Sequence, residues 1–345
     1  MRRKSTLGSG GVLHPAKQTA ERLIVVSAGD NPTLDYYVTP RLAAAMETRP
    51  SRIVTLRDDP DVLLASPEAE GAHLLFCRYV NQPWLDALAD HRERLAGVSV
   101  LLDDDIAAVA RDPSAPLLYR RRLRHRFLDH WPRFSRLIDG ALVSTPALAE
   151  RIHHLPCKLV PPLASPCDEP IAHAPRSRVR IAFHATGIHA AEHAWIGRVI
   201  RRVLRRKADI EMSVVVGWGA RLHWRRVPAQ FIRPAAWTVY REASRQLGAD
   251  LMLAPLLETP ANRVRAPTKR IDAMRMGAAL LTNAADVYRP DPAEIAAGML
   301  VPLDAGKWTT RILDLVSDEA ALRHLAALNA AHVRSWHREA GPLPL

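Results

Sequence analysis

The chain has 345 residues, which is long enough for two domains because a single hydrophobic core seldom grows beyond about 250–300 residues. Apolar residues make up 48% of it and charged residues 24%, a balance that excludes a largely disordered chain. No stretch approaches the roughly 18 consecutive apolar residues of a membrane-spanning helix. Lysine and arginine number 48 against 36 aspartates and glutamates, a net charge of +12, which favours anionic partners such as nucleic acid, phosphorylated sugars or lipid headgroups.

The beginning of the chain carries basic side chains without a following apolar run. This pattern predicts a flexible N-terminal tail over residues 1–20 rather than a secretion signal. Three cysteines, Cys77, Cys157 and Cys167, are too few and too scattered for a disulfide framework or a zinc ribbon. We therefore expect the protein in the reducing cytoplasm.

Short apolar runs alternate with helical patterns along the first half of the chain. The expected strands are Leu23–Ala28, Arg52–Leu56, Ala72–Phe76, Val98–Leu102 and Ala141–Ser144. The expected helices between them include Thr39–Met46, Trp84–Arg94 and Leu117–His130. Strands that alternate with helices form parallel sheets, so residues 21–155 are predicted to be a first Rossmann-like domain.

Prolines separate this half from a second one. Six of them fall between residues 156 and 175, a density that breaks both helix and sheet and predicts an interdomain linker over residues 156–177. Strands are then expected at Val179–His184, Met212–Val216, Asp250–Ala254 and Ala278–Thr282. Amphipathic or Ala/Leu-rich helices are expected at His193–Arg206 and Leu313–Trp336.

The predicted fold is therefore α/β, with two Rossmann-like domains that face an interdomain cleft. Residues 178–318 are the second domain, and residues 319–345 are a C-terminal helix and tail. Ligands of such sheets bind at the carboxyl ends of the strands, so we expect the ligand between the two halves.

The segment Glu258–Tyr288 places cations at the start of a predicted helix. The strand before it leads into a loop that carries Asn262 and Arg265. Thr268 is expected to cap the helix, and Gly277 is expected to end it before the next strand. The positive end of a helix is a ready site for an anion, so this loop is a candidate phosphate site.

Lys269 and Asp272 lie three residues apart and share one face of that helix. A nucleoside diphosphate suits the pair, because Lys269 can meet phosphate oxygens while Asp272 accepts from ribose hydroxyls. A surface ion pair on an ordinary helix is the alternative explanation for the spacing alone.

The wider pattern extends this local one. A strand is followed by N-x-x-R-x-x-x-K-x-x-D, M-G-A and another strand, which resembles the sugar-donor segment of GT-B glycosyltransferases, and more narrowly their bacterial group-1 type. RIAFHATG, ending at Gly187, resembles the first strand and glycine loop of their C-terminal domain. VVVGWG and ADLMLAPL, at 214–219 and 249–256, resemble the later strands.

The resemblance implies transfer of a sugar from a nucleoside-diphosphate sugar to a glycan, lipid-linked or other acceptor, in bacterial polysaccharide biosynthesis. It implies that Gly187 lets the backbone approach the donor phosphates and that Arg265 and Lys269 neutralise the leaving diphosphate. Because basic side chains can stabilise that charge by themselves, no metal or other cofactor is expected. The sugar-donor site that it implies comprises Gly187, His189, Tyr240, Asn262, Arg265, Lys269 and Asp272.

Many relatives carry two glutamates eight residues apart in this segment. Here Asp272 stands near the second position, and no first acid is present. A catalytically inactive protein that binds nucleotide sugars is therefore an alternative, as is a sugar-nucleotide epimerase of the same architecture.

The acceptor side is expected to lie in the first domain. An acceptor hydroxyl must lose a proton, and Asp103, Asp104 and Asp105 follow a predicted strand whose carboxyl end faces the cleft. We predict Asp104 and Asp105 as catalytic, and Asp103 and Arg78 as acceptor-side residues. Asp103 and Asp105 also form D-x-D, the manganese motif of GT-A transferases, and capping of the next helix is a further alternative.

His184, His189 and His193 raise the alternative of a metal site. No fourth ligand has a matching spacing, so zinc is not expected, and His189 is instead predicted to face phosphate.

The helix near Tyr119 has an apolar residue every four positions, Tyr119, Leu123, Phe127 and Trp131, flanked by arginines. This stripe is either a core face or a surface that lies peripherally on an anionic membrane, such as the inner face of the cell membrane. A nucleic-acid-binding protein is the alternative from another class, but no recognition motif of known modules is present, so nucleic acid is not the expected partner.

Overall fold

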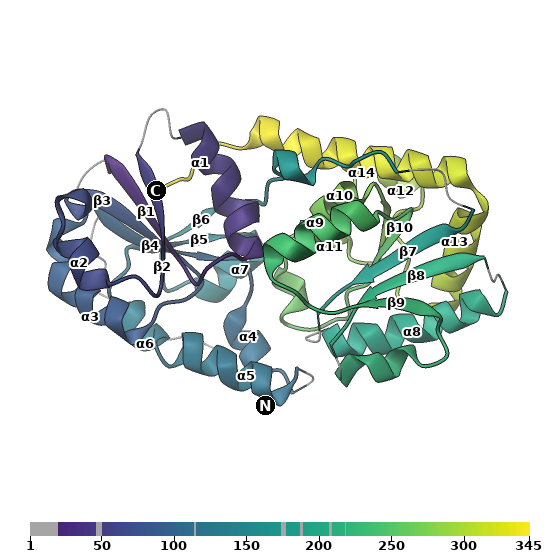
Figure 1. The fold of residues 1–345 in the computed structure, drawn as a ribbon, viewed down its shortest axis with the longest axis horizontal. Helices are drawn as coiled ribbons and strands as arrows, with labels where there is room; N and C mark the ends of the chain where they lie inside the picture. The colour runs from purple at the N-terminus through teal and green to yellow at the C-terminus, as the bar shows by residue number, and fades with distance from the viewer. Residues whose placement is uncertain are drawn as a thin grey trace.

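The computed structural model describes residues 20–45, 50–113, 115–173, 177–186, 189–206, 209–217 and 219–345. The predicted tail therefore falls almost entirely outside the described residues, and Gly187 falls outside them too. The described chain forms two α/β halves side by side (Figure 1). This confirms the predicted fold class.

The first half contains a six-stranded parallel sheet in the order β2-β1-β3-β4-β5-β6. Its strands are β1 (Arg22–Ser27), β2 (Ser51–Thr55), β3 (Ala72–Cys77), β4 (Gly97–Leu102), β5 (Gly140–Val143) and β6 (Cys157–Leu159). The middle strands β3 and β4 are buried along their whole length, which explains why they appear as continuous apolar runs rather than alternating ones.

The helices of this half are α1 (Thr39–Ala45), α2 (Pro60–Ala65), α3 (Gln82–His91), α4 (Ile106–Arg111), α5 (Leu117–Leu123), α6 (Trp131–Phe134) and α7 (Pro146–Ala149). Shorter turns are η1 (Leu34–Val38), η2 (Pro67–Ala69), η3 (Arg92–Arg94), η4 (Arg124–Leu128) and η5 (Glu150–Ile152). Side chains set several of their starts, as where Asn81 accepts from the amide of Trp84 at the start of α3.

The second half contains a five-stranded parallel sheet in the order β11-β10-β7-β8-β9. Its strands are β7 (Val179–His184), β8 (Ile210–Val215), β9 (Ala229–Ile232), β10 (Leu251–Ala254) and β11 (Ala279–Thr282). Its helices are α8 (Ala190–Leu204), α9 (Trp237–Leu247), α10 (Thr268–Met276), α11 (Ala285–Tyr288), α12 (Pro292–Ala296), α13 (Ala305–Ser317) and α14 (Glu319–Glu339), with turns η6 (Pro166–Asp168), η8 (Gly219–Trp224) and η9 (Asn262–Val264).

Three details differ from the sequence-based expectations. The segment predicted as linker begins with β6, which pairs with β5 and extends the first sheet. The final helix is two helices, because the Asp318 carboxylate accepts from the amide of Ala321 and starts α14 anew. Pro267, not Thr268, occupies the cap position of α10. Gly277 ends α10 as expected, in a left-handed conformation with φ of 71° that glycine adopts at little cost.

The C-terminal segment links the halves. Helix α14 runs along α10 and β11 of the second half, and the chain then returns to the first sheet (Figure 1). Val333 and Leu343 join an apolar cluster with Leu23 and Leu75 of that sheet. The residues after 318 therefore pack on both halves.

Each sheet has one point where the strand order reverses. It lies between β1 and β3 in the first sheet and between β7 and β10 in the second. The loops that leave the two strands at such a point run in opposite directions and open a crevice at their carboxyl ends. Residues that follow β1, β3, β7 and β10 line one cavity at the junction of the halves. Of the described helices, none has the length and apolar content required to cross a membrane.

Candidate functional site

A cleft of about 520 Å³ lies between the halves at the carboxyl ends of both sheets. This volume falls within the range of small-molecule sites. Charged lining residues include Asp30, Arg78, Asp103, Asp104, Arg265, Lys269 and Asp272. Aromatic and imidazole lining residues are Tyr36, Tyr37, Tyr119, His184, His189, Trp237 and Tyr240.

One wall of the cleft carries an arginine between two carboxylates. Arg78 follows β3, and its guanidinium lies 3.3 Å from Asp103 and 3.6 Å from Asp104, which follow β4. The Thr33 hydroxyl donates to Asp103 at 2.8 Å. Arg78 has a φ of 68°, a left-handed conformation that is strained for arginine and that clusters at functional sites.

The two carboxylates on this wall differ in environment. Burial raises the pKa of Asp103 despite the nearby charge of Arg78. Asp104 is more exposed and also faces Arg265 of the opposite half at 3.9 Å. It is thus the acidic group that lies between a cation of each half.

The opposite wall carries Lys269 at the start of α10. Its ammonium donates to one oxygen of Asp272 at 2.6 Å. The other Asp272 oxygen accepts from the Tyr36 hydroxyl of the first half at 2.5 Å, and from Arg275. Burial alone would raise the pKa of Asp272, but Lys269 and Arg275 outweigh it and hold that pKa below its usual range.

These contacts of Asp272 bear on its expected role as the residue that binds the ribose hydroxyls. A carboxylate that already accepts from three side chains is a poor acceptor for ribose hydroxyls. Asp272 instead orients Lys269 toward the cleft and ties the first half to α10 through Tyr36. The predicted proximity of Lys269 and Asp272 is present, but the contacts favour a positioning part for Asp272.

Asn262 is also a positioning residue in this geometry. Its amide donates to Glu192 at 2.7 Å and to the Leu257 carbonyl at 2.8 Å, and its oxygen accepts from Arg265 at 2.9 Å. Asn262 is buried and does not line the cleft. The three bonds fix the loop so that the guanidinium of Arg265 faces the cleft.

His184 at the end of β7 and His193 of α8 are held by other side chains and by the backbone. The Ala185 carbonyl, 2.9 Å from Nε2 of His193, can only accept, so Nε2 carries the proton. The other ring nitrogen accepts from the Trp224 indole at 2.9 Å. His184 contacts Tyr240 and Ser213. These contacts argue against the metal alternative.

His189 lies at the start of α8 and lines the cleft, as expected for a phosphate-facing residue. Burial and the charge of Arg265 lower its pKa, so the ring is neutral near pH 7. Thr186, on the other side of the undescribed Gly187, lines the same cleft. The starts of α8 and α10 therefore face one cavity.

His193 carries a testable consequence for stability. Burial lowers its pKa from 6.5 to about 4. The unfolded chain then binds more protons between these values, so the free energy of unfolding falls as pH falls from 6.5 towards 4. His193→Phe leaves the Trp224 indole and the Ala185 carbonyl buried without a partner, and should lower that free energy by about 2–4 kcal/mol at pH 7.

Urea unfolding at pH 7.5 and 5 measures both effects. The variant should be less stable at pH 7.5 and should lose less stability on acidification than the parent. His324→Phe, a change at an exposed position of α14, is the control. Equal losses in parent and His193→Phe would contradict the assignment.

A second set of contacts holds the halves together beside the cleft. Asp30 accepts from the amide of Thr238 at 2.8 Å, and Asp35 accepts from the Trp237 indole at 2.6 Å. The Tyr36 ring meets the edge of Trp237 at a centroid distance of 5.3 Å. The start of α9 thus contacts the loop after β1.

The cleft brings together most of the predicted site residues. Arg78, Asp103, Asp104, His189, Tyr240, Arg265, Lys269 and Asp272 all line it. Asp105 does not line it, because its carboxylate accepts from the Ala108 amide and caps α4. The capping alternative therefore describes Asp105, and the D-x-D metal motif loses one of its members.

Two further residues of the site, Tyr36 and Trp237, were not predicted. Both follow strands at the carboxyl edges of their sheets, so chain topology was the available signal. Neither stands in a motif. Their contact joins positions about 200 residues apart, which no local pattern reveals.

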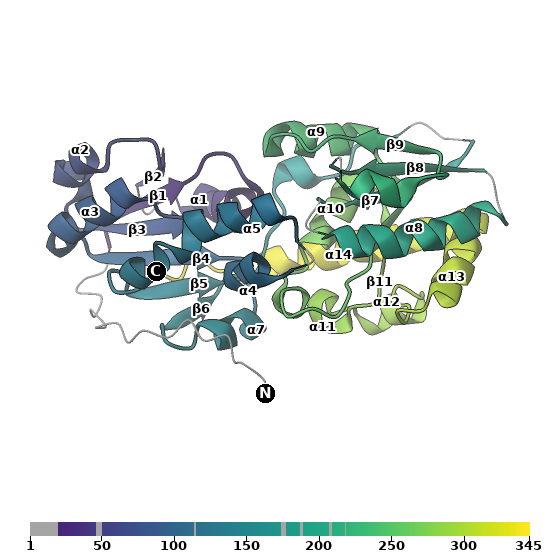
Figure 2. The same ribbon diagram turned by 90° about the horizontal axis from the view of Figure 1, so that it is seen from below.

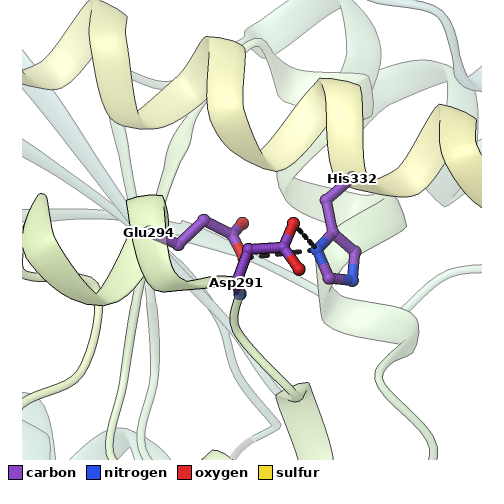
Figure 3. A group of neighbouring side chains, drawn as sticks. All are labelled: Asp291, Glu294 and His332. Carbon is purple, nitrogen blue, oxygen red and sulfur yellow. Dashed lines mark hydrogen bonds and ion pairs between the residues drawn. The ribbon is translucent and has the colours of Figure 1, made fainter.

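One cluster outside the cleft has ligand types that suit a metal. Asp291, Glu294 and His332 gather where α12 meets α14 (Figure 3), and it is the one such group among the described residues. His332 lies 2.9 Å from Asp291 and 3.3 Å from Glu294. Both oxygens of Glu294 already accept from Arg270, at 2.6 and 2.9 Å. A guanidinium in this place repels a cation, so the role of the cluster is structural: it joins α12 to α14.

Comparison with known proteins yields structural matches alone: no family model and no curated protein sequence matches the chain. An OtsA apo structure matches with a TM-score of 0.56 and 10% identity, over 91% of this chain and 96% of that one. A trehalose-6-phosphate structure from E. coli, bound with UDP-2-fluoro glucose, matches with a TM-score of 0.50, 10% identity, and coverage of 91% and 95%.

TarM matches with a TM-score of 0.51 and 9% identity, over 77% of this chain and 52% of TarM. The chain thus spans about half the length of TarM. A related S. aureus TarM structure, with a TM-score of 0.50 and 8% identity over the same shares of the two chains, is a complex with fondaparinux, alpha-GlcNAc-glycerol and UDP. At these identities the matches establish the fold and not the activity.

The GT-A alternative, a single-domain fold, is wrong because two parallel sheets face one cleft. Both the strand orders and the matched structures agree with the resemblance seen in the sequence. The chain therefore has the two-domain fold of GT-B glycosyltransferases.

Proposed function

We propose that the chain transfers a sugar from a nucleoside-diphosphate sugar to a hydroxyl group of a glycan or lipid-linked acceptor. One observation carries the proposal: the starts of α8 and α10, together with Arg265 and Lys269, line the same cleft as a pair of carboxylates from the other half. Cations and helix starts suit a diphosphate, and a facing carboxylate suits a hydroxyl that must lose its proton.

The diphosphate side supplies the leaving-group chemistry. As the bond from the anomeric carbon to the diphosphate oxygen breaks, its electron pair stays on that oxygen. Negative charge therefore builds beside Lys269 and Arg265. Preplaced cations in a site of low water content stabilise that charge most where it develops. Asp272 and Asn262 keep the two cations in place. We propose no metal, because these side chains provide the positive charge.

The acceptor side needs a base. The Asp104 carboxylate lines the cleft, and its partners among the described side chains are Arg78 and Arg265, at 3.6 and 3.9 Å, so an oxygen lone pair is open to a hydroxyl. The acceptor oxygen attacks the anomeric carbon and its proton passes to Asp104. Asp103 holds Arg78, which in turn orients Asp104.

The missing first acid of the sugar-donor segment raised the alternative of an inactive protein. An inactive protein that only binds nucleotide sugars would keep the cationic wall and need no base. The carboxylates opposite that wall favour the active form. Origin in bacterial polysaccharide synthesis stays a prediction from the resemblance.

A thermal-shift screen of nucleoside diphosphates and their sugars, run in EDTA, tests donor binding. A ligand at 100 times its Kd adds about 2.7 kcal/mol to apparent stability, so the matching donor should raise Tm by several degrees. The free nucleoside, which lacks phosphates, should raise it far less. Lys269→Ala should remove most of the shift.

Arg263→Ala is the matched control, because Arg263 is a largely exposed cation of the same loop that does not line the cleft. It should leave the shift intact. A shift that survives Lys269→Ala, or that is equal for nucleoside and nucleotide, would contradict the proposed phosphate contact. Binding to DNA with no response to any nucleotide would favour the nucleic-acid alternative.

A further inference from the structure

Helix α5 begins with two exposed leucines. Leu117 is 54% exposed and Leu118 is 77% exposed. Among the described large apolar side chains, these two stand next to one another in sequence at the surface. Exposed apolar side chains at a helix start cost free energy in water unless they have a partner surface.

Arginines surround these leucines. Arg121, Arg122, Arg124 and Arg126 are all exposed, and none of them forms an ion pair with a described residue. Spacings of three and four residues put Leu118 on the same face as Arg121 and Arg122. The described part of this surface therefore combines apolar side chains with uncompensated positive charge.

The other side of α5, and of η4 and α6 that follow it, is fixed to the core. Leu123 of α5, Phe127 of η4 and Trp131 of α6 are buried in the apolar cluster of the first half. The stripe that the sequence showed is thus a core face, and the arginines and leucines lie on its solvent side. Because the core face cannot turn outward, the exposed face keeps its orientation.

The position of α5 relates this surface to the cleft. Tyr119 of α5 lines the cleft, and the Arg122 guanidinium lies over its ring at 5.4 Å. Figures 1 and 2 both show α5 at the edge of the first half that borders the junction. A flat surface in contact with α5 would therefore lie next to the cleft.

We propose that this face of α5 and η4 binds an anionic lipid bilayer. The leucines enter the boundary between headgroups and acyl chains, while the arginines contact lipid phosphates. Resting on the proposed function, the inference names the acceptor class: a lipid-linked hydroxyl compound that reaches Asp104 from the bilayer. A nucleic acid also attracts arginines, but its phosphate backbone offers nothing to Leu117 and Leu118.

Vesicle flotation tests the bilayer contact. The full chain is mixed with phosphatidylcholine vesicles containing 30% phosphatidylglycerol, or with pure phosphatidylcholine vesicles, at low and at physiological salt. We expect binding to the anionic vesicles alone. Each arginine adds about 1 kcal/mol near an anionic surface, so Arg121→Gln with Arg122→Gln should lower the partition coefficient roughly thirtyfold.

Leu117→Ser with Leu118→Ser should also lower partitioning while leaving the charge unchanged. The matched control is Arg323→Gln with Arg338→Gln on α14, which removes the same charge from the opposite side of the molecule (Figure 1); it should float like the parent. All variants should keep the thermal shift with nucleotide, which separates this test from the test of sugar transfer.

In the flotation assay, each of these results would overturn the inference: no flotation with anionic vesicles at low salt, equal loss in the α14 control, or full binding after the leucine changes. Single-stranded DNA at equal phosphate concentration serves as a competitor. Displacement from vesicles by DNA, with binding to DNA that ignores the leucine changes, would assign the surface to nucleic acid instead.

Discussion

Replacing Asp104 by asparagine is expected to lower the rate of sugar transfer about 100- to 10,000-fold, the usual contribution of a general base. The amide keeps the size of the side chain and its place between Arg78 and Arg265. It cannot take the proton of an acceptor hydroxyl. Because the change leaves the cationic wall intact, the thermal shift with the sugar donor should remain. The loss should therefore appear in kcat, measured with a saturating donor.

Asp105→Asn is the matched control for this prediction. It changes the neighbouring carboxylate in the same way, and asparagine still caps α4 through the Ala108 amide. Transfer should stay near the parent rate. Equal losses in the two variants would mean that charge near the end of β4, rather than a base at position 104, supports the reaction. Full activity in Asp104→Asn would exclude Asp104 as the base.

The fold could be predicted in outline because its strands are strongly apolar. Nine expected strands correspond to β1–β5, β7, β8, β10 and β11, each within two residues of the predicted bounds. The two missed strands, β6 and β9, are short and half-exposed, so they lack the apolar run that made the others visible. β6 also lies between prolines, in the segment whose composition predicts a linker.

The site could be predicted where a side chain follows a strand of a parallel sheet. Arg78 and Asp104 are such cases, since the carboxyl ends of parallel strands meet at one edge. The hydrogen-bond partners of the site residues could not be predicted. Asp272 has Lys269 three residues away, but its other oxygen accepts from Tyr36, 236 positions earlier. Spacing in sequence therefore gave the right helix face and an incomplete set of contacts.

Two buried arginines are a further case in which the sequence did not reveal the contact partners. Arg270 and Arg275 stand in a run of charged residues that resembles a solvent-facing helix, yet both are fully buried. Burial of such a group is tolerated when acids are already in place. Arg275 meets Asp168 and Asp272. Asp168 comes from η6, more than a hundred positions earlier, so the local sequence alone predicts a solvent-facing position for Arg275.

Replacing Arg270 by methionine is expected to lower the free energy of unfolding by about 3–5 kcal/mol, since it leaves a charged group buried without its partner. The Arg270 and Glu294 side chains are 0% and 1% exposed. The guanidinium donates to both Glu294 oxygens, to the Tyr288 carbonyl at 2.7 Å, and to Asn329 at 3.1 Å. It thereby joins α10 to α11, α12 and α14.

The urea midpoint of the variant measures this effect, and two further variants calibrate it. Arg323→Met removes the exposed partner of Glu319 and should cost well under about 1 kcal/mol. Arg270→Met combined with Glu294→Leu removes both buried charges and should recover much of the loss, because two apolar groups need no desolvation of charge. If Arg270→Met were as stable as the parent, the proposed contribution of the Arg270–Glu294 ion pair to stability would be wrong.

The Arg270–Glu294 ion pair also holds the start of α10 at the cleft, because Lys269 precedes Arg270 on the first turn of that helix. In a fully folded sample at low temperature, Arg270→Met should weaken nucleotide binding less than Lys269→Ala does. If the two variants weakened binding equally, the position of α10, and not the ammonium of Lys269, would be the feature that the diphosphate requires.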